Sequence, residues 1–114
     1  MEELLKEMQK DLEAELVSEL HTESDKALLS SKIKGAYREV KGKRNYQEHH
    51  TEEFINKDME KMYGVIKYLA LYDWNLIGAE GHESYSENGV ARKFVKRDEI
   101  LAKVVPFVNI LQKS

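Results

Sequence analysis

Three neighbouring side chains, His49, His50 and Glu53, belong to residue types that bind metal ions in proteins. The two histidines are adjacent, so their imidazoles are expected to point in different directions, and the sequence offers no further cluster of ligands nearby. The chain has no cysteine, which excludes thiolate metal sites and disulfides. We therefore expect no metal site and no cofactor.

Asp73 is the acidic residue with the most apolar sequence surroundings, because it lies between Tyr72 and Trp74. General acid–base catalysis would require a partner acid, base or metal, and none is close to it in the sequence. Pairing with Arg92 or Lys93, or exposure to solvent, explains the residue instead. The chain also lacks a glycine-rich phosphate loop and a serine nucleophile motif, so we do not expect an enzyme.

Basic residues gather in the middle of the chain, although its net charge is −3. Residues 26–44 hold seven bases and one acid, whereas residues 1–25 hold nine acids and two bases. The basic segment 32–44, followed by Tyr46, supports an alternative function, a small regulatory protein that binds nucleic acid by charge and base stacking. A solvated or salt-bridged helix face explains the same pattern without any ligand.

The length of 114 residues predicts a single domain over residues 1–114. No apolar run approaches the roughly 20 residues needed to span a bilayer, and the acidic start of the chain is not typical of a signal peptide. Together with the lack of cysteine, these features favour the cytosol, or a particle assembled there, and no membrane partner.

Apolar residues recur every three or four positions, which predicts helices at about 2–20, 25–41, 51–77 and 98–104. The segment at about 82–95 contains Asn-Gly between polar and apolar residues, the pattern of a two-residue β-hairpin turn. The expected fold is therefore mainly α. It is a small helical bundle of three main helices plus a short C-terminal helix, with a projecting β-hairpin.

Several residues refine the expected helices. Thr22 and Asp25 have the spacing of a capping box before the second helix, and Gly42 is expected to end that helix. Gly64 lies inside the long third helix, where close packing against another helix would explain it, with a hinge as the alternative. The apolar stretch 68–77 predicts burial on every side.

The hairpin and the tail supply the candidate interface. A two-residue turn would place aromatic, apolar and arginine side chains on one hairpin face, a composition typical of binding anchors. The tail after Pro106 is apolar and β-prone, and fits either a buried edge strand or a segment that docks on another subunit or partner. The interface candidates are Tyr85, Asn88, Gly89, Val90, Arg92, Phe94, Phe107 and Ile110.

Several segments resemble the tailed-phage head–tail connector proteins, also called adaptor or head-completion proteins, of phages and prophages of Gram-positive bacteria. The resemblance covers roughly residues 4–110. The segments that carry it are Arg38-Glu39-Val40-Lys41, Arg44-Asn45-Tyr46, Ala70-Leu71-Tyr72-Asp73-Trp74-Asn75 and Ile77-Gly78-Ala79-Glu80-Gly81-His82-Glu83-Ser84-Tyr85-Ser86-Glu87-Asn88-Gly89-Val90-Ala91-Arg92. The most specific part is the block over residues 78–92, and the strongly acidic first helix departs from the family pattern.

This resemblance implies a structural virion protein at the head–tail interface, assembled in the bacterial host cytoplasm. It implies a dodecameric ring that docks under the portal protein after DNA packaging, formed from a protein that could be a monomer when free. The ring would extend the DNA channel and provide the attachment site for the next stopper or tail component. Viral DNA would pass through it without sequence-specific binding.

The two charged faces are expected to act in assembly or in the channel. In one arrangement, acids of the first helix pair with bases of the second helix of a neighbouring subunit. In the other, the acids line the channel, where repulsion of the phosphate backbone lets DNA slide. The residues concerned are Glu7, Glu13, Glu15, Lys32, Lys34 and Arg38.

Overall fold

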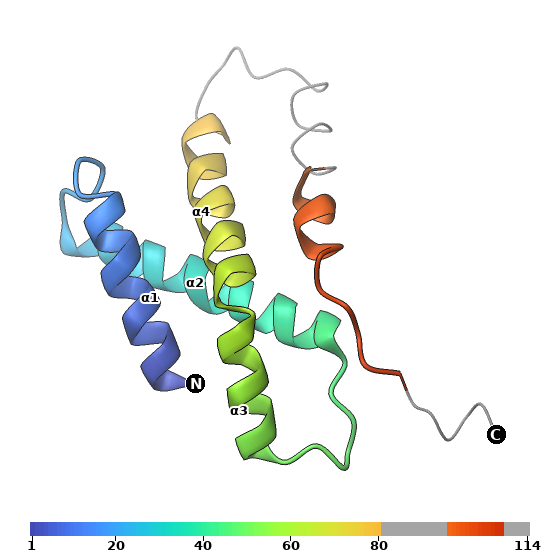
Figure 1. The fold of residues 1–114 in the computed structure, drawn as a ribbon. Coiled ribbons are helices and arrows are strands. Elements are labelled where there is room, and N and C mark those ends of the chain that lie inside the picture. The colour runs from blue at the N-terminus through green and yellow to red at the C-terminus, as the bar shows by residue number, and fades with distance from the viewer. Residues whose placement is uncertain (81–95, 109–114) are drawn as a thin grey trace.

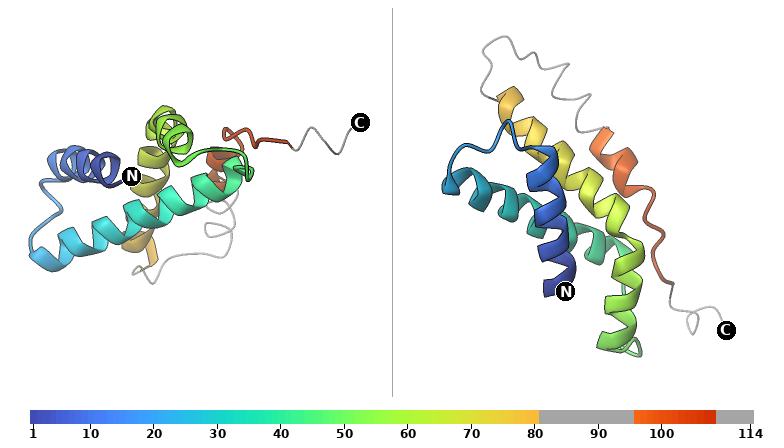
Figure 2. Two further views of the ribbon diagram at one scale, coloured as in Figure 1. Left: turned by 90° about the horizontal axis from the view of Figure 1, so that it is seen from below. Right: turned by 60° about the vertical axis from the view of Figure 1, so that its left-hand side comes forward.

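The computed structural model describes residues 1–80 and 96–108, which form a helical bundle (Figure 1). Its labelled helices are α1 (Glu2–Glu15), α2 (Glu23–Arg44), α3 (Glu52–Lys61) and α4 (Tyr63–Glu80). A further short helix covers residues 96–101. The long α2 runs across α1 and α4, which both pack against it (Figures 1 and 2).

Helix α2 starts at the expected capping box and is longer than expected mainly because it ends later. At its start, the Thr22 hydroxyl accepts a hydrogen bond from the Asp25 amide and the Asp25 carboxylate accepts one from the Thr22 amide, each at 3.1 Å. The expected capping box is thus confirmed. Gly42 does not end the helix. Asn45 does, with a left-handed φ of 58°, a conformation that asparagine tolerates better than most residues.

The single helix expected at 51–77 is two helices. The Met62 amide bonds to the carbonyl of Met59, three residues back, at 2.9 Å, and this tighter turn separates α3 from α4. Gly64, just after the break, is exposed, and a Cβ added to it would meet no atom within 4 Å. Close helix packing therefore does not explain this glycine.

The architecture differs from the expected bundle of three main helices with a hairpin. Four main helices are present, the first ends at Glu15 rather than near residue 20, and the last short helix begins at residue 96. Residues 1–80 and 96–108 contain no strand, and the apolar residues after Pro106 do not form one. The hairpin expected at about 82–95 lies outside the described residues, so only the helical part of the expected fold class is retained.

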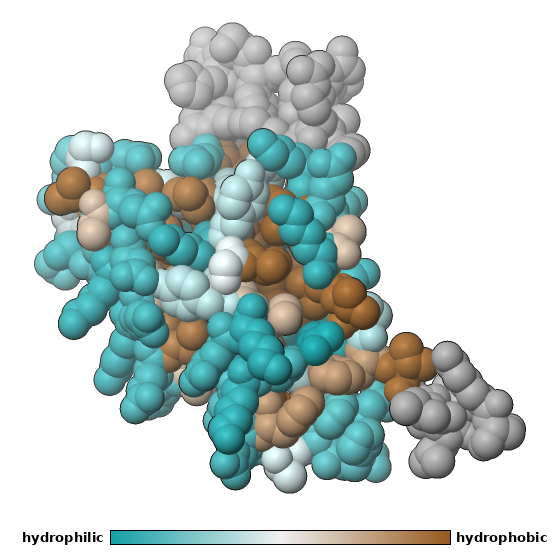
Figure 3. Space-filling model, in the orientation of Figure 1, coloured by the Kyte–Doolittle hydropathy of each residue, from teal (hydrophilic) through white to brown (hydrophobic). Residues whose placement is uncertain are grey.

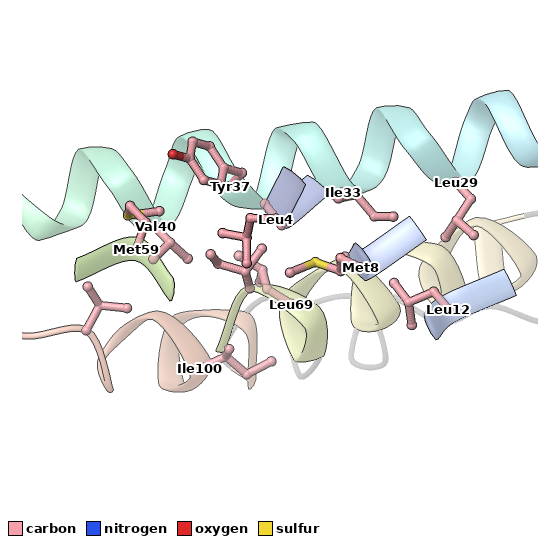
Figure 4. Close-up of a cluster of buried hydrophobic side chains, with 14 of the residues drawn as sticks. Leu4, Met8, Leu12, Leu29, Ile33, Tyr37, Val40, Met59, Leu69 and Ile100 are labelled. Atoms are coloured by element: carbon pink, nitrogen blue, oxygen red, sulfur yellow. The ribbon is translucent and has the colours of Figure 1, made fainter. Parts of the chain in front are cut away.

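The core is one cluster to which every helix contributes (Figure 4). Leu4, Met8 and Leu12 of α1 and its C-cap residue Leu16, at successive intervals of four, turn the same face of that helix inward. The other helices and the segment after residue 96 complete the cluster with Leu29, Ile33, Ala36, Tyr37, Val40, Met59, Ile66, Leu69, Ala70, Ile100 and Val104. Because residues 100 and 104 are buried, the chain after residue 96 belongs to the bundle.

Burial of the stretch 68–77 is one-sided rather than complete. Leu69 and Ala70 are fully buried, whereas Tyr68 is 48% exposed and Trp74 is partly buried. The surface seen in Figure 3 is mostly hydrophilic, with apolar residues gathered where α4 meets the segment after residue 96. An apolar sequence on all sides of α4 therefore leaves part of its surface open to solvent.

Candidate interaction surfaces

Three acidic residues in the second half of α1 and just after it form hydrogen bonds or an ion pair with α4 of the same chain. The Tyr63 hydroxyl donates to Asp11, the Lys67 ammonium pairs with Glu15, and the Trp74 indole donates to Glu19 at 3.1 Å. The pKa of Tyr63 is raised above its usual range, mainly because the side chain is buried and secondly because its hydroxyl donates to Asp11. Glu15, an expected contact to a neighbouring subunit or the channel, thus has a partner within its own chain.

The other charged residues expected to act in assembly or in the channel do not all lie on one surface. Glu13 accepts a hydrogen bond from the Gln9 amide at 2.8 Å, and Glu7 is exposed. Lys34 and Arg38, four residues apart, lie on one face of α2. Lys32 lies about 160° around the helix from Lys34, at 100° per residue. The structure therefore brings two of the three expected bases together and separates the third.

Lys34 and Arg38 line a groove between α1 and α2, which we call the basic groove. It has a volume of about 590 Å³, and Met1 and Leu5 contribute apolar surface to it. Lys6 of α1 adds a third cation, and Glu2 is the one acidic residue that lines it. The positive charge of this hollow comes from both helices, which the sequence pattern of either helix alone does not reveal.

A second hollow of about 410 Å³ continues along α2 and shares Arg38 with the basic groove. Lys41, Asn45 and Tyr46 also line it. Lys34, Arg38 and Lys41 recur at intervals of four and three residues, which places them in one row on the helix. Within the described residues none of these three cations forms an ion pair, so the row is free to meet an external negative charge.

An acidic groove, also of about 590 Å³, lies on the other side of the first turn of α1. Its carboxylates belong to Glu2, Glu3, Glu52 and Glu60, and no lysine, arginine or histidine lines it. Glu52, Asn56 and Glu60 follow one another at intervals of four along α3 and so form one edge of that helix. This edge was not among the expected sites, although its four-residue spacing is visible in the sequence.

A buried polar cluster fixes the end of α2 to α3. The Asp58 carboxylate, 5% exposed, accepts hydrogen bonds from Arg44 Nε at 2.7 Å and Nη2 at 3.0 Å, and from the Tyr46 hydroxyl at 2.6 Å. The hydrogen bond from Arg44 is the main reason that the pKa of Asp58 is lowered. Burial and the bond to Asp58 raise the pKa of Tyr46 above its usual range.

The same cluster holds Phe107 of the tail against the bundle. The Phe107 amide donates to the Arg44 carbonyl at 2.8 Å, the Arg44 guanidinium lies 4.0 Å from the centre of the phenyl ring, and Arg44 also donates to the Val105 carbonyl. The Phe107 ring centre is 5.5 Å from that of Tyr46 and 4.6 Å from that of His50. Phe107 therefore packs on its own chain, in an extended segment that is not a strand.

His50 is part of this aromatic cluster. Its Nδ1 accepts a hydrogen bond from the Gln47 amide at 2.9 Å, and its ring stacks on Phe54 with 4.8 Å between centres. The pKa of His50 is lowered, mainly by burial and secondly by the charge of the neighbouring His49. Among the described residues no group of three histidines or carboxylates could hold a metal ion.

Asp73 also has a structural partner. Arg97 donates to both of its carboxylate oxygens, from Nε at 2.8 Å and from Nη2 at 3.1 Å. The same guanidinium bonds both oxygens of Glu39 at 2.7 and 2.6 Å, and so links α2, α4 and the helix at 96–101. These hydrogen bonds are the main cause of the raised pKa of Arg97. The expected partners of Asp73, Arg92 and Lys93, lie outside the described residues.

Most of the expected hairpin and tail interface also lies outside the described residues, namely Tyr85, Asn88, Gly89, Val90, Arg92, Phe94 and Ile110. Within residues 1–80 and 96–108, no helix is long and apolar enough to cross a membrane. Comparisons of the chain with protein-family models, with curated proteins and with solved structures gave no match.

Proposed function

We propose that this protein is a head–tail connector of a tailed phage or prophage, a structural virion component without catalytic activity. It docks as a ring, dodecameric by the resemblance, under the portal after DNA packaging. It extends the DNA channel and receives the next stopper or tail component. The observation that carries the proposal is the resemblance of residues 78–92, from Gly-Ala-Glu-Gly to Ser-Glu-Asn-Gly-Val-Ala-Arg, to this family.

The surroundings of this block are consistent with a role in contacts. The block starts at the end of α4, and the next described residues, 96–101, are tied back to α4 by the double hydrogen bond of Arg97 to Asp73. The described residues before and after 81–95 are therefore both held at the same helix, α4. A binding segment held at both ends by a packed scaffold loses less freedom on association than one held at a single end.

Nucleic-acid binding through the basic segment 32–44 is the second candidate function. The row formed by Lys34, Arg38 and Lys41, with Tyr46 lining the same hollow as Arg38 and Lys41, is the observation that favours it. Cations beside an aromatic ring are typical of surfaces that bind single-stranded nucleic acid. Such binding would weaken steeply as the salt concentration rises.

Electron microscopy of portal rings mixed with the purified protein tests the connector proposal. We expect an additional ring of density on the portal. We also expect its loss in a Tyr85→Ala/Arg92→Ala variant that keeps the thermal stability of the wild type. Ser84→Ala/Ser86→Ala, which changes the same segment without removing the aromatic ring or the charge, is the matched control and should still assemble. Folded wild-type protein that adds no density to intact portals would contradict the proposal.

A further inference from the structure

We propose that neighbouring copies join by placing the α3 edge of one copy, Glu52, Asn56 and Glu60, in the basic groove of the next. There it would meet Lys6, Lys34 and Arg38. This inference rests on the proposed function, because it supplies the contact between subunits of the ring. The occupant of the basic groove is thus a second copy of this chain.

The two surfaces match in length as well as in sign. With a rise of about 1.5 Å per residue, the row of cations that starts in the basic groove at Lys34 and continues to Lys41 in the adjoining hollow extends over ~10 Å of α2. The carboxylates of Glu52 and Glu60 are ~12 Å apart along α3 by the same measure. Opposite charges can therefore meet along the row instead of at one point, which fixes the register of the contact.

The groove also contains apolar surface, which favours a protein over a polyanion as its occupant. The partly buried Leu5 and the exposed Met1 line the basic groove, and Met1 also lines the acidic groove beside the α3 edge. A phosphate backbone would use the cations but not this apolar surface. An amphipathic helix uses both, as in helix-in-groove recognition.

The positions of the grooves make the contact heterologous. Both grooves are lined by Met1 and Glu2 and so lie on different sides of the same helix turn of α1. One copy therefore presents its basic groove to one neighbour and its α3 edge to the other. Contacts between two different surfaces generate a ring when the rotation closes and a filament when it does not.

Within the described residues, none of the five charged groups at this contact has an ion-pair partner of its own. Their charges are exposed in one copy and become paired between copies. Association should therefore be strongest at low ionic strength and weaken as salt screens the charges, with a screening length near 10 Å at about 0.1 M.

Sedimentation equilibrium of the full chain at low and high salt provides the test. We expect wild-type protein to associate at low salt, with a dissociation constant that rises by about tenfold or more in Lys34→Glu/Arg38→Glu and in Glu52→Lys/Glu60→Lys. An equimolar mixture of these two variants should associate again, because the reversed surfaces attract each other. Lys32→Glu/Lys43→Glu makes the same change in net charge on another face of α2 and should leave association unchanged.

Wild-type protein that stays monomeric at millimolar concentration and low salt overturns the inference. So does a mixture of the two reversed variants that fails to associate, or short DNA that binds the basic groove while copies do not. The portal experiment separates this result from the proposed function. If Lys34→Glu/Arg38→Glu still adds a ring to the portal, the contact is wrong and the connector function stands. If wild-type protein adds none, the function itself fails.

Discussion

Replacing Asp58 by alanine is the sharpest test of how the C-terminal segment is held. The Asp58 side chain is 5% exposed, and that of Arg44, which donates two hydrogen bonds to it, is 17% exposed. The substitution leaves a buried guanidinium without its carboxylate and the Tyr46 hydroxyl without its acceptor. Breaking a buried ion pair from one side typically costs 3–5 kcal/mol, so the loss is of that order.

The lower end of this range is expected here. Arg44 keeps its hydrogen bond to the Val105 carbonyl and retains some contact with solvent, which reduces the cost of leaving its charge unpaired. A loss of about 3 kcal/mol corresponds to a fall in Tm of about 12 °C for a chain of this size, at about 4 °C per kcal/mol. Glu60→Ala, on the same helix but exposed and without an ion pair, should change the free energy of unfolding by less than about 0.5 kcal/mol.

Thermal unfolding of wild type and Asp58→Ala, monitored by circular dichroism from pH 7 to pH 2, measures the loss of stability and tests whether the Asp58 carboxylate causes it. The pKa of Asp58 is lower in the folded than in the unfolded chain, so its contribution is fully present above the unfolded value of about 3.9. It disappears as the pH falls through the folded value. The difference in stability between wild type and Asp58→Ala should therefore shrink below about pH 4. A difference in Tm below 2 °C at pH 7, or one that does not change with pH, would refute the reasoning.

Two further substitutions test the rest of the bundle. Arg97→Met leaves the carboxylates of Asp73 and Glu39 without their cation, and hydrogen bonds to charged groups contribute about 1.5–3 kcal/mol each. We expect hydrogen exchange to accelerate in residues 96–104 while α1 and α2 stay protected, and equal acceleration everywhere would argue against a local role. Leu69→Ala opens a cavity at a fully buried position and should destabilise the chain by about 2–5 kcal/mol in urea unfolding. A loss under 1 kcal/mol would show that the core around α4 is loosely packed.

Local sequence rules predicted the features that depend on neighbouring residues. The capping box of Thr22 and Asp25 follows from side chains that reach amides three residues away. The three- and four-residue spacing of apolar residues predicted that Met8, Leu12 and Leu16 face inward, although Leu4 rather than Leu5 is the buried residue before them. These interactions close within one turn of helix, so the order of residues suffices to define them.

Contacts between distant segments could not be predicted in this way. Gly42 offered a plausible helix end, yet Asn45 ends α2, where its side chain donates to the Phe107 carbonyl, 62 residues away, at 3.0 Å. Arg97 bonds Asp73 because the helix at 96–101 packs beside α4, and this partner was not among those expected, Arg92 and Lys93, which lie outside the described residues. Which cation reaches a carboxylate on another helix depends on how the two helices pack, and sequence spacing does not contain that information.

The sequence by itself determined a helical protein with an acidic first helix and a basic second helix, because periodicity and charge are properties of residue order. Only the tertiary structure decided how those charges are used. The fold turns Asp11 and Glu15 toward Tyr63 and Lys67 of α4, and leaves Lys34 and Arg38 in an open groove. The physical reason is that a charge becomes an internal pair or a free surface according to which helix packs against it.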